Sequence, residues 1–317
     1  MSKLSLVSLY PETTADGIAF VDVGCSGSVA PTWEKLFPLL VYTGFDPNAD
    51  ECLRLGALEH PFKSARYLPY AIAGQNGEQN LVITKSLYCS SLLRPNHVWL
   101  RRFTYADLFT EIGSEPVRCV TLDELAAQEN LRADILKLDT QGMELPILQS
   151  GANILDGAFC VETETGFVEN YVGETTYAQV DAFMRGHGFL MFDLTMHRIG
   201  RNNALAEHGR QQPMWCEAVW LRDFIGNGDA PDRGQAIKSL IICQALEYYD
   251  YGLELAQYYR QHGIIDAKEF EKIEKVETWT PGRVRKAPGS RTGRVLQHLP
   301  DSINDRLWYG LREIMEG

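Results

Sequence analysis

Apolar runs and helical patterns alternate along the first two thirds of the chain. Five short runs of mostly apolar, β-type residues are expected to form buried strands, at 18–23, 41–46, 65–73, 134–139 and 159–162. Stretches with the apolar spacing of helices lie between these runs and begin near positions 31, 49, 121, 144 and 177. This alternation predicts βαβ units with right-handed crossovers, and therefore a Rossmann-like α/β fold with a mainly parallel sheet.

Two later regions depart from the alternation. The pattern weakens over residues 86–116, where serines and aromatic residues gather, and we expect a long active-site loop there. Residues 189–194 and 215–221 read as a closing pair of strands, plausibly antiparallel, which brings the expected sheet to seven strands.

The composition changes after residue 226. A turn-rich linker at 227–232 precedes three stretches with the apolar spacing of helices, at 235–262, 266–276 and 302–315. We therefore expect an α/β domain over residues 1–225, flanked by helices, and a helical C-terminal extension over residues 226–317.

The charge and the cysteines narrow the class of protein. A formal net charge of −12 argues against a large nucleic-acid surface, because such binding depends on clustered Lys and Arg. The seven cysteines stand singly, so neither a structural zinc site nor a disulfide framework is expected, and reduced thiols favour the cytoplasm. No secretory signal and no membrane span are predicted. The expectation is a soluble cytoplasmic protein.

The first candidate site follows the first strand. Gly24 and Gly27 allow a close approach of the backbone to a ligand, but they do not complete the G-x-G-x-x-G dinucleotide pattern. Asp22 lies within the strand, where it would repel a pyrophosphate and suit a positively charged ligand such as S-adenosylmethionine (SAM). Asp46 ends the second strand, a position from which a carboxylate binds ribose hydroxyls. Together these residues predict nucleoside binding.

The second candidate site joins carboxylates at the ends of central strands. Asp139 and Glu162 are expected side by side, where they could deprotonate a hydroxyl, bind a divalent cation or steer the positive charge of SAM. Glu144 and Glu162 could instead accept backbone hydrogen bonds with no catalytic part. His97, in the 86–116 loop, is a candidate base or substrate contact, against a plain surface histidine. A metal-free site is the favoured interpretation, and sensitivity to EDTA would separate the two forms.

A family resemblance rests on segments in a fixed order. They are FVDVGCSGS (20–28), YTGFDPN (42–48), YAIAGQNGEQNLVIT (70–84), ADILKLDTQGMELPILQSGA (133–152) and YAQVDAFMRGHGFLMFDL (177–194). Over roughly residues 15–222 the chain resembles FkbM-type methyltransferases, which use SAM to methylate hydroxyls. Members usually have Glu where this chain has Gln141, so that carboxylate is missing here as a base, and Asp139 is the better candidate.

The resemblance implies a class I methyltransferase fold and a role for each candidate residue. Contacts to the methionine part of SAM fall to Asp22, Gly24, Ser26 and Gly27. Asp46, with Pro47 beside it, would bind the ribose, and Ala71 and Ile72 would contact the adenine.

The expected activity is therefore O-methylation of a small molecule, sugar or glycan, with SAM as cofactor. The alternatives are an NAD-dependent oxidoreductase or epimerase on the same sheet and a non-catalytic nucleoside-binding protein. The extension over residues 226–317 could pack on its own domain, cover the acceptor pocket or form a homodimer.

Overall fold

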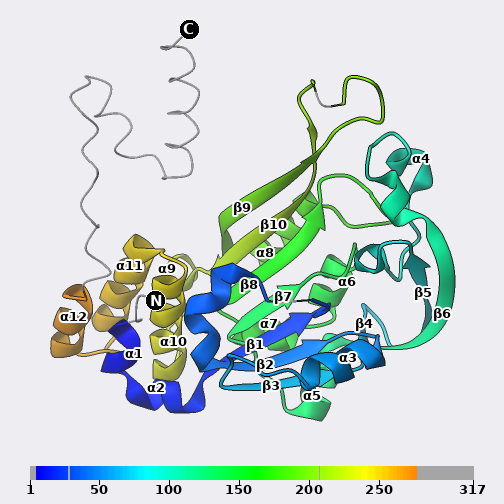
Figure 1. The fold of residues 1–317 in the computed structure, drawn as a ribbon. Helices are drawn as coiled ribbons and strands as arrows, with labels where there is room; N and C mark the ends of the chain where they lie inside the picture. The colour runs from blue at the N-terminus through cyan, green and yellow to red at the C-terminus, as the bar shows by residue number, and fades with distance from the viewer. Residues whose placement is uncertain (1–4, 28, 207, 277–317) are drawn as a thin grey trace, which may run out of the picture. The chain divides into compact units, whose positions relative to one another are not determined.

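A seven-stranded sheet lies at the centre of the described chain (Figure 1). The computed structural model describes residues 5–27, 29–206 and 208–276, which belong to one unit over residues 1–279. All neighbouring strands are parallel except β10, which is antiparallel to both β8 and β9. In sheet order, the strands are β3 (Ser64–Leu68), β2 (Leu40–Phe45), β1 (Ile18–Val23), β7 (Ile135–Leu138), β8 (Cys160–Gly166), β10 (Gln212–Arg222) and β9 (Phe189–Ile199). This arrangement confirms the predicted fold class and the antiparallel closing pair.

Helices cover both faces of the sheet. Side chains alternate between the two faces along β1. Phe20 joins a hydrophobic cluster on one face, and Val21 and Val23 join a second cluster on the other face. The first face is covered by α1 (Ser5–Leu9), α2 (Pro11–Asp16), η1 (Pro31–Leu39), α10 (Arg233–Ala245) and α11 (Tyr249–Gln261). The second face is covered by α5 (Leu122–Glu129), α6 (Glu144–Gln149), α7 (Ala152–Gly157) and α8 (Tyr177–Gly186). The predicted helix after Pro31 is a 3-10 helix, and Pro38 inside it has no N–H to donate.

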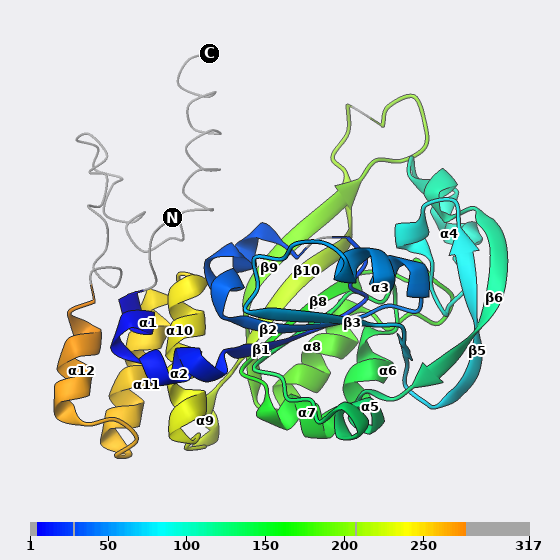
Figure 2. The same ribbon diagram turned by 60° about the horizontal axis from the view of Figure 1, so that its bottom comes forward.

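A second, three-stranded sheet stands beside the carboxyl ends of β1, β2 and β3 (Figure 2). It consists of β4 (Ala71–Ile72), β6 (Glu111–Val120) and β5 (Gly77–Thr84), in that order. The prediction of one strand over 65–73 was wrong, because the chain leaves the main sheet after Leu68 and residues 71–72 pair with β6 instead.

The predicted 86–116 loop is shorter than expected and partly regular. It contains η2 (Leu87–Cys89), α4 (His97–Leu100) and η3 (Ala106–Phe109), and its last residues belong to β6. These short elements and the second sheet cover the carboxyl ends of the central strands.

The helix predicted over 235–262 was wrong as a single element. It is divided into α10 and α11, and Glu247 adopts a left-handed conformation with φ 66° in the turn between them. The turn lets Leu240 of α10 and Leu255 of α11 pack into the same cluster as Phe20 of the sheet, which one straight helix would not allow.

The remaining described helices are α3 (Ala49–Gly56), α9 (Phe224–Asn227) and α12 (Ala267–Glu274). The helix predicted over 302–315 lies outside the described residues. The boundary at 225/226 and the homodimer stay predictions.

Candidate active site

A cavity of about 910 Å³ opens at the carboxyl ends of the central strands. The main sheet contributes Gly24, Asp46 and Asp139, each just beyond the end of its strand, and Glu164, which lies two residues before the end of β8. The second sheet and the short helices form the opposite wall, whose apolar and aromatic members include Leu81, Ile83, Tyr88, Tyr105 and Leu108. Ligands of open α/β sheets bind at this edge, so the cavity is the candidate active site.

The turn after β1 depends on Gly24. This residue has φ +83°, and a Cβ added to it would lie 1.9 Å from the backbone oxygen of Asp139. The Gly24 and Cys25 N–H groups both donate to the Phe45 oxygen, at 2.9 and 3.1 Å, which fixes the turn against β2. A side chain at Gly24 is therefore excluded by the packing of β1 between β2 and β7.

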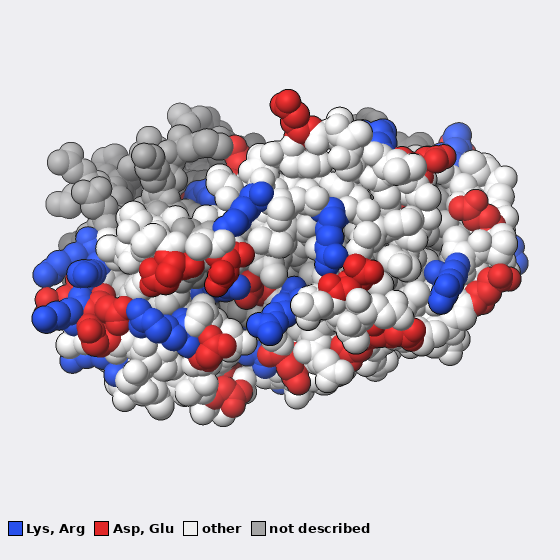
Figure 3. Space-filling model, turned by 90° about the horizontal axis from the view of Figure 1, so that it is seen from below, with Lys and Arg blue, Asp and Glu red and all other residues white. Residues whose placement is uncertain are grey.

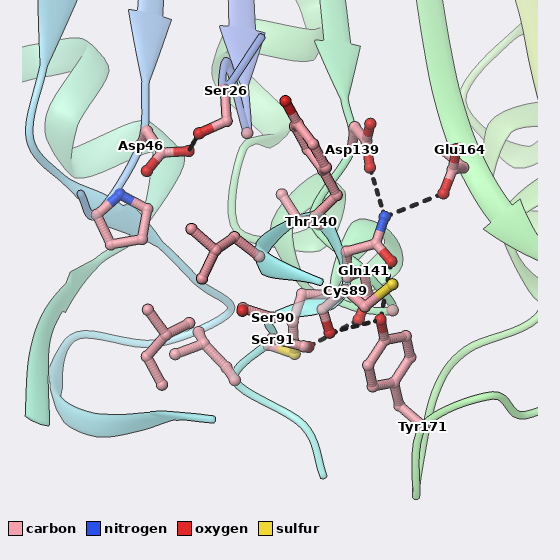
Figure 4. Close-up of a pocket in the computed structure, with 18 of the residues that line it drawn as sticks. Ser26, Asp46, Cys89, Ser90, Ser91, Asp139, Thr140, Gln141, Glu164 and Tyr171 are labelled. Atoms are coloured by element: carbon pink, nitrogen blue, oxygen red, sulfur yellow. Dashed lines mark hydrogen bonds between the residues drawn. The ribbon is translucent and has the colours of Figure 1, made fainter. Parts of the chain in front are cut away.

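Asp46 is held in a defined orientation at the end of β2. Ser26 Oγ donates to its Oδ2 at 2.8 Å, and the Asn48 N–H donates to its Oδ1 at 2.8 Å (Figure 4). Burial raises the pKa of Asp46, and the hydrogen bonds from Asn48 and Ser26 oppose that increase. Pro47, Ala71 and Ile72 also line the cavity here. The cavity lining here includes Gly24, Ser26, Asp46, Pro47, Ala71 and Ile72, the residues predicted to bind the cofactor, and we call them the cofactor end of the cavity.

Asp22 and Gly27 do not line the cavity. Asp22 is buried, where it accepts hydrogen bonds from Tyr42 Oη at 2.7 Å and Lys137 Nζ at 3.0 Å. Asp22 was predicted to contact the methionine part of SAM, but it lies within β1 and is bound by Tyr42 and Lys137 instead. Gly27 was predicted to make the same contact, and its φ of +101° supports the turn after β1.

Glu162 also lies away from the cavity, contrary to the expected position. Its Oε2 accepts a hydrogen bond from Trp33 Nε1 at 2.7 Å, and strand register aligns it with Lys137 and Asp22 in a buried row. Burial raises the pKa of Glu162 to about 7, and the nearby Lys137 ammonium opposes that increase. These contacts favour the structural alternative for Glu162.

His97 is likewise separate from the cavity. It lies on α4 with its side chain about half exposed, and its Nε2 is 3.3 Å from Glu111 Oε1. It borders a smaller hollow on the outside of this region. This position fits the surface histidine that was the alternative to a catalytic role.

Asp139 lines the cavity and has a partner that the sequence did not predict. Gln141 Nε2 donates to Asp139 Oδ1 at 2.8 Å and to Glu164 Oε1 at 3.0 Å, so one amide group bridges two carboxyl groups (Figure 4). We call Asp139 and Glu164 the carboxylate pair. Burial and the nearby charge of Asp139 together raise the pKa of Glu164 to about 8, and the Gln141 hydrogen bond opposes the increase.

The loop between Asp139 and Glu144 is shaped by hydrogen bonds to one side chain. Glu144 is fully buried and accepts from Thr140 N–H at 2.9 Å, from Thr140 Oγ1 at 3.0 Å and from Gly142 N–H at 3.1 Å. Burial raises the pKa of Glu144 to about 7, against the effect of these hydrogen bonds. Glu144 is therefore a structural acceptor for this loop.

Glu164 was missed because the predicted strand was too short. The expected strand ended at Glu162, whereas β8 continues to Gly166, so Glu164 rather than Glu162 reaches the cavity. Its spacing of two residues from Glu162 places it on the same face of the strand, which was the available signal. Tyr171 and Trp215 also line the cavity without a sequence prediction.

The described chain shows neither a metal-binding cluster nor a membrane-spanning helix. Residues 5–27, 29–206 and 208–276 contain no group of three or more His, Cys, Asp or Glu side chains placed to hold a metal ion. Within the same ranges, no helix has the length and apolar character needed to cross a membrane.

Known proteins were compared with the chain. No curated protein matches it. Solved structures that match include a magnesium protoporphyrin IX methyltransferase from Synechocystis with bound SAM, at 10% identity and TM-score 0.31, covering 69% of this chain and 78% of that one. Another is a proposed tRNA (m1A22) methyltransferase from Streptococcus pneumoniae, at 10% identity and TM-score 0.33, covering 84% and 92%. A SAM-dependent methyltransferase from Anabaena variabilis matches at 12% identity and TM-score 0.32, covering 69% and 84%.

The family comparison is more specific. The model of the methyltransferase FkbM domain matches residues 27–191, which is more than half of the 317 residues. The match includes Asp46 and both members of the carboxylate pair. The chain belongs to the FkbM methyltransferase family and is a SAM-dependent methyltransferase.

Proposed function

We propose that this enzyme transfers the methyl group of SAM to a hydroxyl oxygen of a small molecule, sugar or glycan. The observation that carries the proposal is a single cavity with the cofactor end on one side and the carboxylate pair on the other. Asp46 would bind the ribose hydroxyls, Ala71 and Ile72 the adenine, and Gly24 and Ser26 the methionine part. The methyl carbon would then lie beside the carboxylate pair.

The reaction would be an in-line displacement. The acceptor oxygen forms a bond to the methyl carbon while the carbon–sulfur bond breaks, and its electron pair stays on sulfur to give S-adenosylhomocysteine. The hydroxyl proton passes to a carboxylate of the pair, because an alcohol is too weak an acid to lose it unaided. The chain's own work is to hold both molecules in line and to accept that proton.

The charge of the cavity restricts the acceptor. The acidic residues among its described lining are Asp46, Glu51, Glu115, Asp139, Glu164 and Glu174. Arg54 is the one cationic side chain in that lining, and it is engaged by Glu51 through two hydrogen bonds of 2.6 and 2.7 Å. A phosphorylated or carboxylated acceptor would therefore meet repulsion with no available counter-charge, so we propose an uncharged or cationic acceptor.

Surface charge is consistent with such an acceptor. On the face shown in Figure 3, Lys and Arg side chains lie among Asp and Glu side chains.

An acceptor with an apolar or ring-shaped body would also find aromatic contacts, because Tyr105 and Trp215 line the cavity with ring centroids 6.1 Å apart. A cytoplasmic location and the absence of a nucleic-acid partner stay predictions.

Acceptor charge can be tested with matched pairs of compounds. We expect methyl glycosides and amino sugars to be methylated with a kcat/KM at least about tenfold above that of their phosphorylated counterparts, equivalent to ~1.4 kcal/mol of differential binding. The measurement is release of S-adenosylhomocysteine at constant ionic strength. Equal kcat/KM for a sugar and its phosphate would contradict the proposed selectivity.

The cofactor assignment can be tested at Asp46. Asp46→Ala is expected to weaken SAM binding about 10- to 100-fold, because hydrogen bonds to a charged group contribute ~1.5–3 kcal/mol. Calorimetric titration with SAM, S-adenosylhomocysteine and NAD measures this. The matched control is Asp50→Ala, an exposed aspartate on α3 outside the cavity, which should bind SAM as the wild type does. Unchanged SAM affinity in Asp46→Ala, or preferential binding of NAD, would refute the assignment.

A further inference from the structure

The carboxylate pair and Gln141 form a connected group whose two acids have different surroundings. Asp139 lies on the cofactor side, where its backbone oxygen packs against Gly24 and its N–H donates to Val23 at 2.9 Å. Glu164 lies on the next strand, β8, further from the turn after β1. Both side chains line the cavity.

On this basis we propose that Glu164 is the base that takes the proton of the acceptor hydroxyl, and that Gln141 is a positioning residue that holds it. The inference rests on the proposed O-methylation and names the group that completes it. Asp139 is left to face the positive sulfonium of SAM.

The surroundings of each carboxyl group support this division of roles. Asp139 interacts favourably with Lys137, whose pKa it helps to raise against the opposing effect of burial. The charged groups with the largest influence on Glu164 are acids, namely Asp139, Glu144 and Glu217. A carboxylate without a cationic partner holds a proton more tightly, which suits Glu164 to the role of base.

Free acceptor capacity also favours Glu164. Its described hydrogen bond involves Oε1 alone, which leaves Oε2 without a hydrogen-bond partner among the described residues. Because Glu164 lines the cavity, this oxygen is available to accept a hydroxyl proton while Oε1 stays bound to Gln141. The protonated carboxyl then returns its proton to solvent through the open cavity.

Gln141 is itself fixed by contacts to its side chain and to its backbone. Tyr171 Oη donates to its Oε1 at 2.8 Å, and Ser91 Oγ donates to its backbone oxygen at 2.7 Å. With the amide oxygen toward Tyr171, the NH₂ group points toward the two carboxyl groups, which accept its hydrogen bonds. Its φ of 56° is uncommon for a residue with a Cβ and costs free energy that the surrounding contacts must offset. The amide thus links both acids without adding a third negative charge.

The central test compares Glu164→Gln with the wild type. With tritium-labelled SAM and a panel of uncharged methyl glycosides, we expect kcat to fall about 100- to 10,000-fold, the usual contribution of a general base. KM and the affinity for SAM should change little. Glu217→Gln is the matched control, since Glu217 also influences Glu164 but does not line the cavity, and it should retain the wild-type kcat.

The pH profile distinguishes a base from a structural residue. The wild-type kcat should rise with pH through about 8, because Glu164 must lose its proton before it can accept one. This rise should be absent in Glu164→Gln. In Gln141→Glu it should move to higher pH, because the bridging hydrogen bond is replaced by another negative charge.

A second readout needs no acceptor. Carbon-13 NMR of the glutamate carboxyl groups, with S-adenosylhomocysteine bound, should show a group titrating near pH 8 that is missing in Glu164→Gln. If Glu164 titrates below about pH 5, near the ordinary range of Glu, the inference is overturned even without turnover. A kcat and pH profile unchanged in Glu164→Gln would overturn it too. Wild-type SAM binding without methyl transfer to any hydroxyl compound would instead count against the proposed function.

Discussion

Gly24→Ala is expected to abolish SAM binding, with a loss of at least about 100-fold, or ~2.8 kcal/mol. The added Cβ would lie 1.9 Å from the Asp139 backbone oxygen, and φ at this position is +83°. Either the turn after β1 or the end of β7 must therefore move. Both carry residues of the cavity, so the cofactor end and Asp139 would be displaced together.

A matched glycine provides the control for this experiment. Gly56 ends α3, has no heavy atom within 4 Å of an added Cβ and has no positive φ, so Gly56→Ala should leave SAM binding unchanged. Calorimetric titration with SAM and far-UV circular dichroism on both variants separate lost binding from lost folding. If Gly24→Ala folds and binds SAM within about threefold of the wild type, the proposed position of the cofactor is incorrect.

The part of the site that depends on local pattern could be predicted from the sequence. Buried parallel strands appear as short apolar runs, so the ends of β1, β2 and β7 were identified to within a residue. Gly24, Asp46 and Asp139 follow from those ends, and all of them line the cavity. Ligands bind where such strands end, which is why three separate segments predicted one site.

The part that depends on pairing between distant segments could not be predicted. β8 is longer than its apolar run because it pairs with β10 as far as Gly166, and this pairing brings Glu164 to the cavity. Residues 71–72 leave the main sheet because β6, which begins forty residues later in the chain, supplies their partners. The division between α10 and α11 at Glu247 likewise reflects packing against the sheet rather than any Gly or Pro in the sequence.

A row of buried charged residues beneath the cavity links the fold to the site. Strand register aligns Asp22 of β1 with Lys137 of β7, and Lys137 with Glu162 of β8. Lys137 Nζ is 3.0 Å from Asp22 Oδ1, and both side chains are largely shielded from solvent. The same three strands carry Gly24, Asp139 and Glu164 at their carboxyl ends, so the row supports the floor of the cavity.

Lys137→Met should destabilise the fold by about 3–5 kcal/mol, because removal of one partner leaves a buried charge uncompensated. Urea unfolding at neutral pH measures this. Lys35→Met is the matched control, because the ion pair between Lys35 and Glu247 is partly exposed. Such pairs contribute about 0–1 kcal/mol, so the free energy of unfolding should change by no more than that.

The cost of Lys137→Met should also depend on pH in a defined direction. The pKa of Glu162 is already raised to about 7 in the folded wild type, and loss of the ammonium raises it further. An acid whose pKa is higher in the folded state stabilises the fold at low pH and loses that contribution as pH rises through its folded pKa. The difference between Lys137→Met and the wild type should therefore shrink as pH falls toward about 7, because Glu162 takes up its proton at a higher pH in the folded variant. Below that pH the difference should stay constant, because Glu162 is neutral in both proteins. A pH-independent difference would mean that Lys137 stabilises the sheet by packing alone, and that the charges beneath the cavity are not coupled.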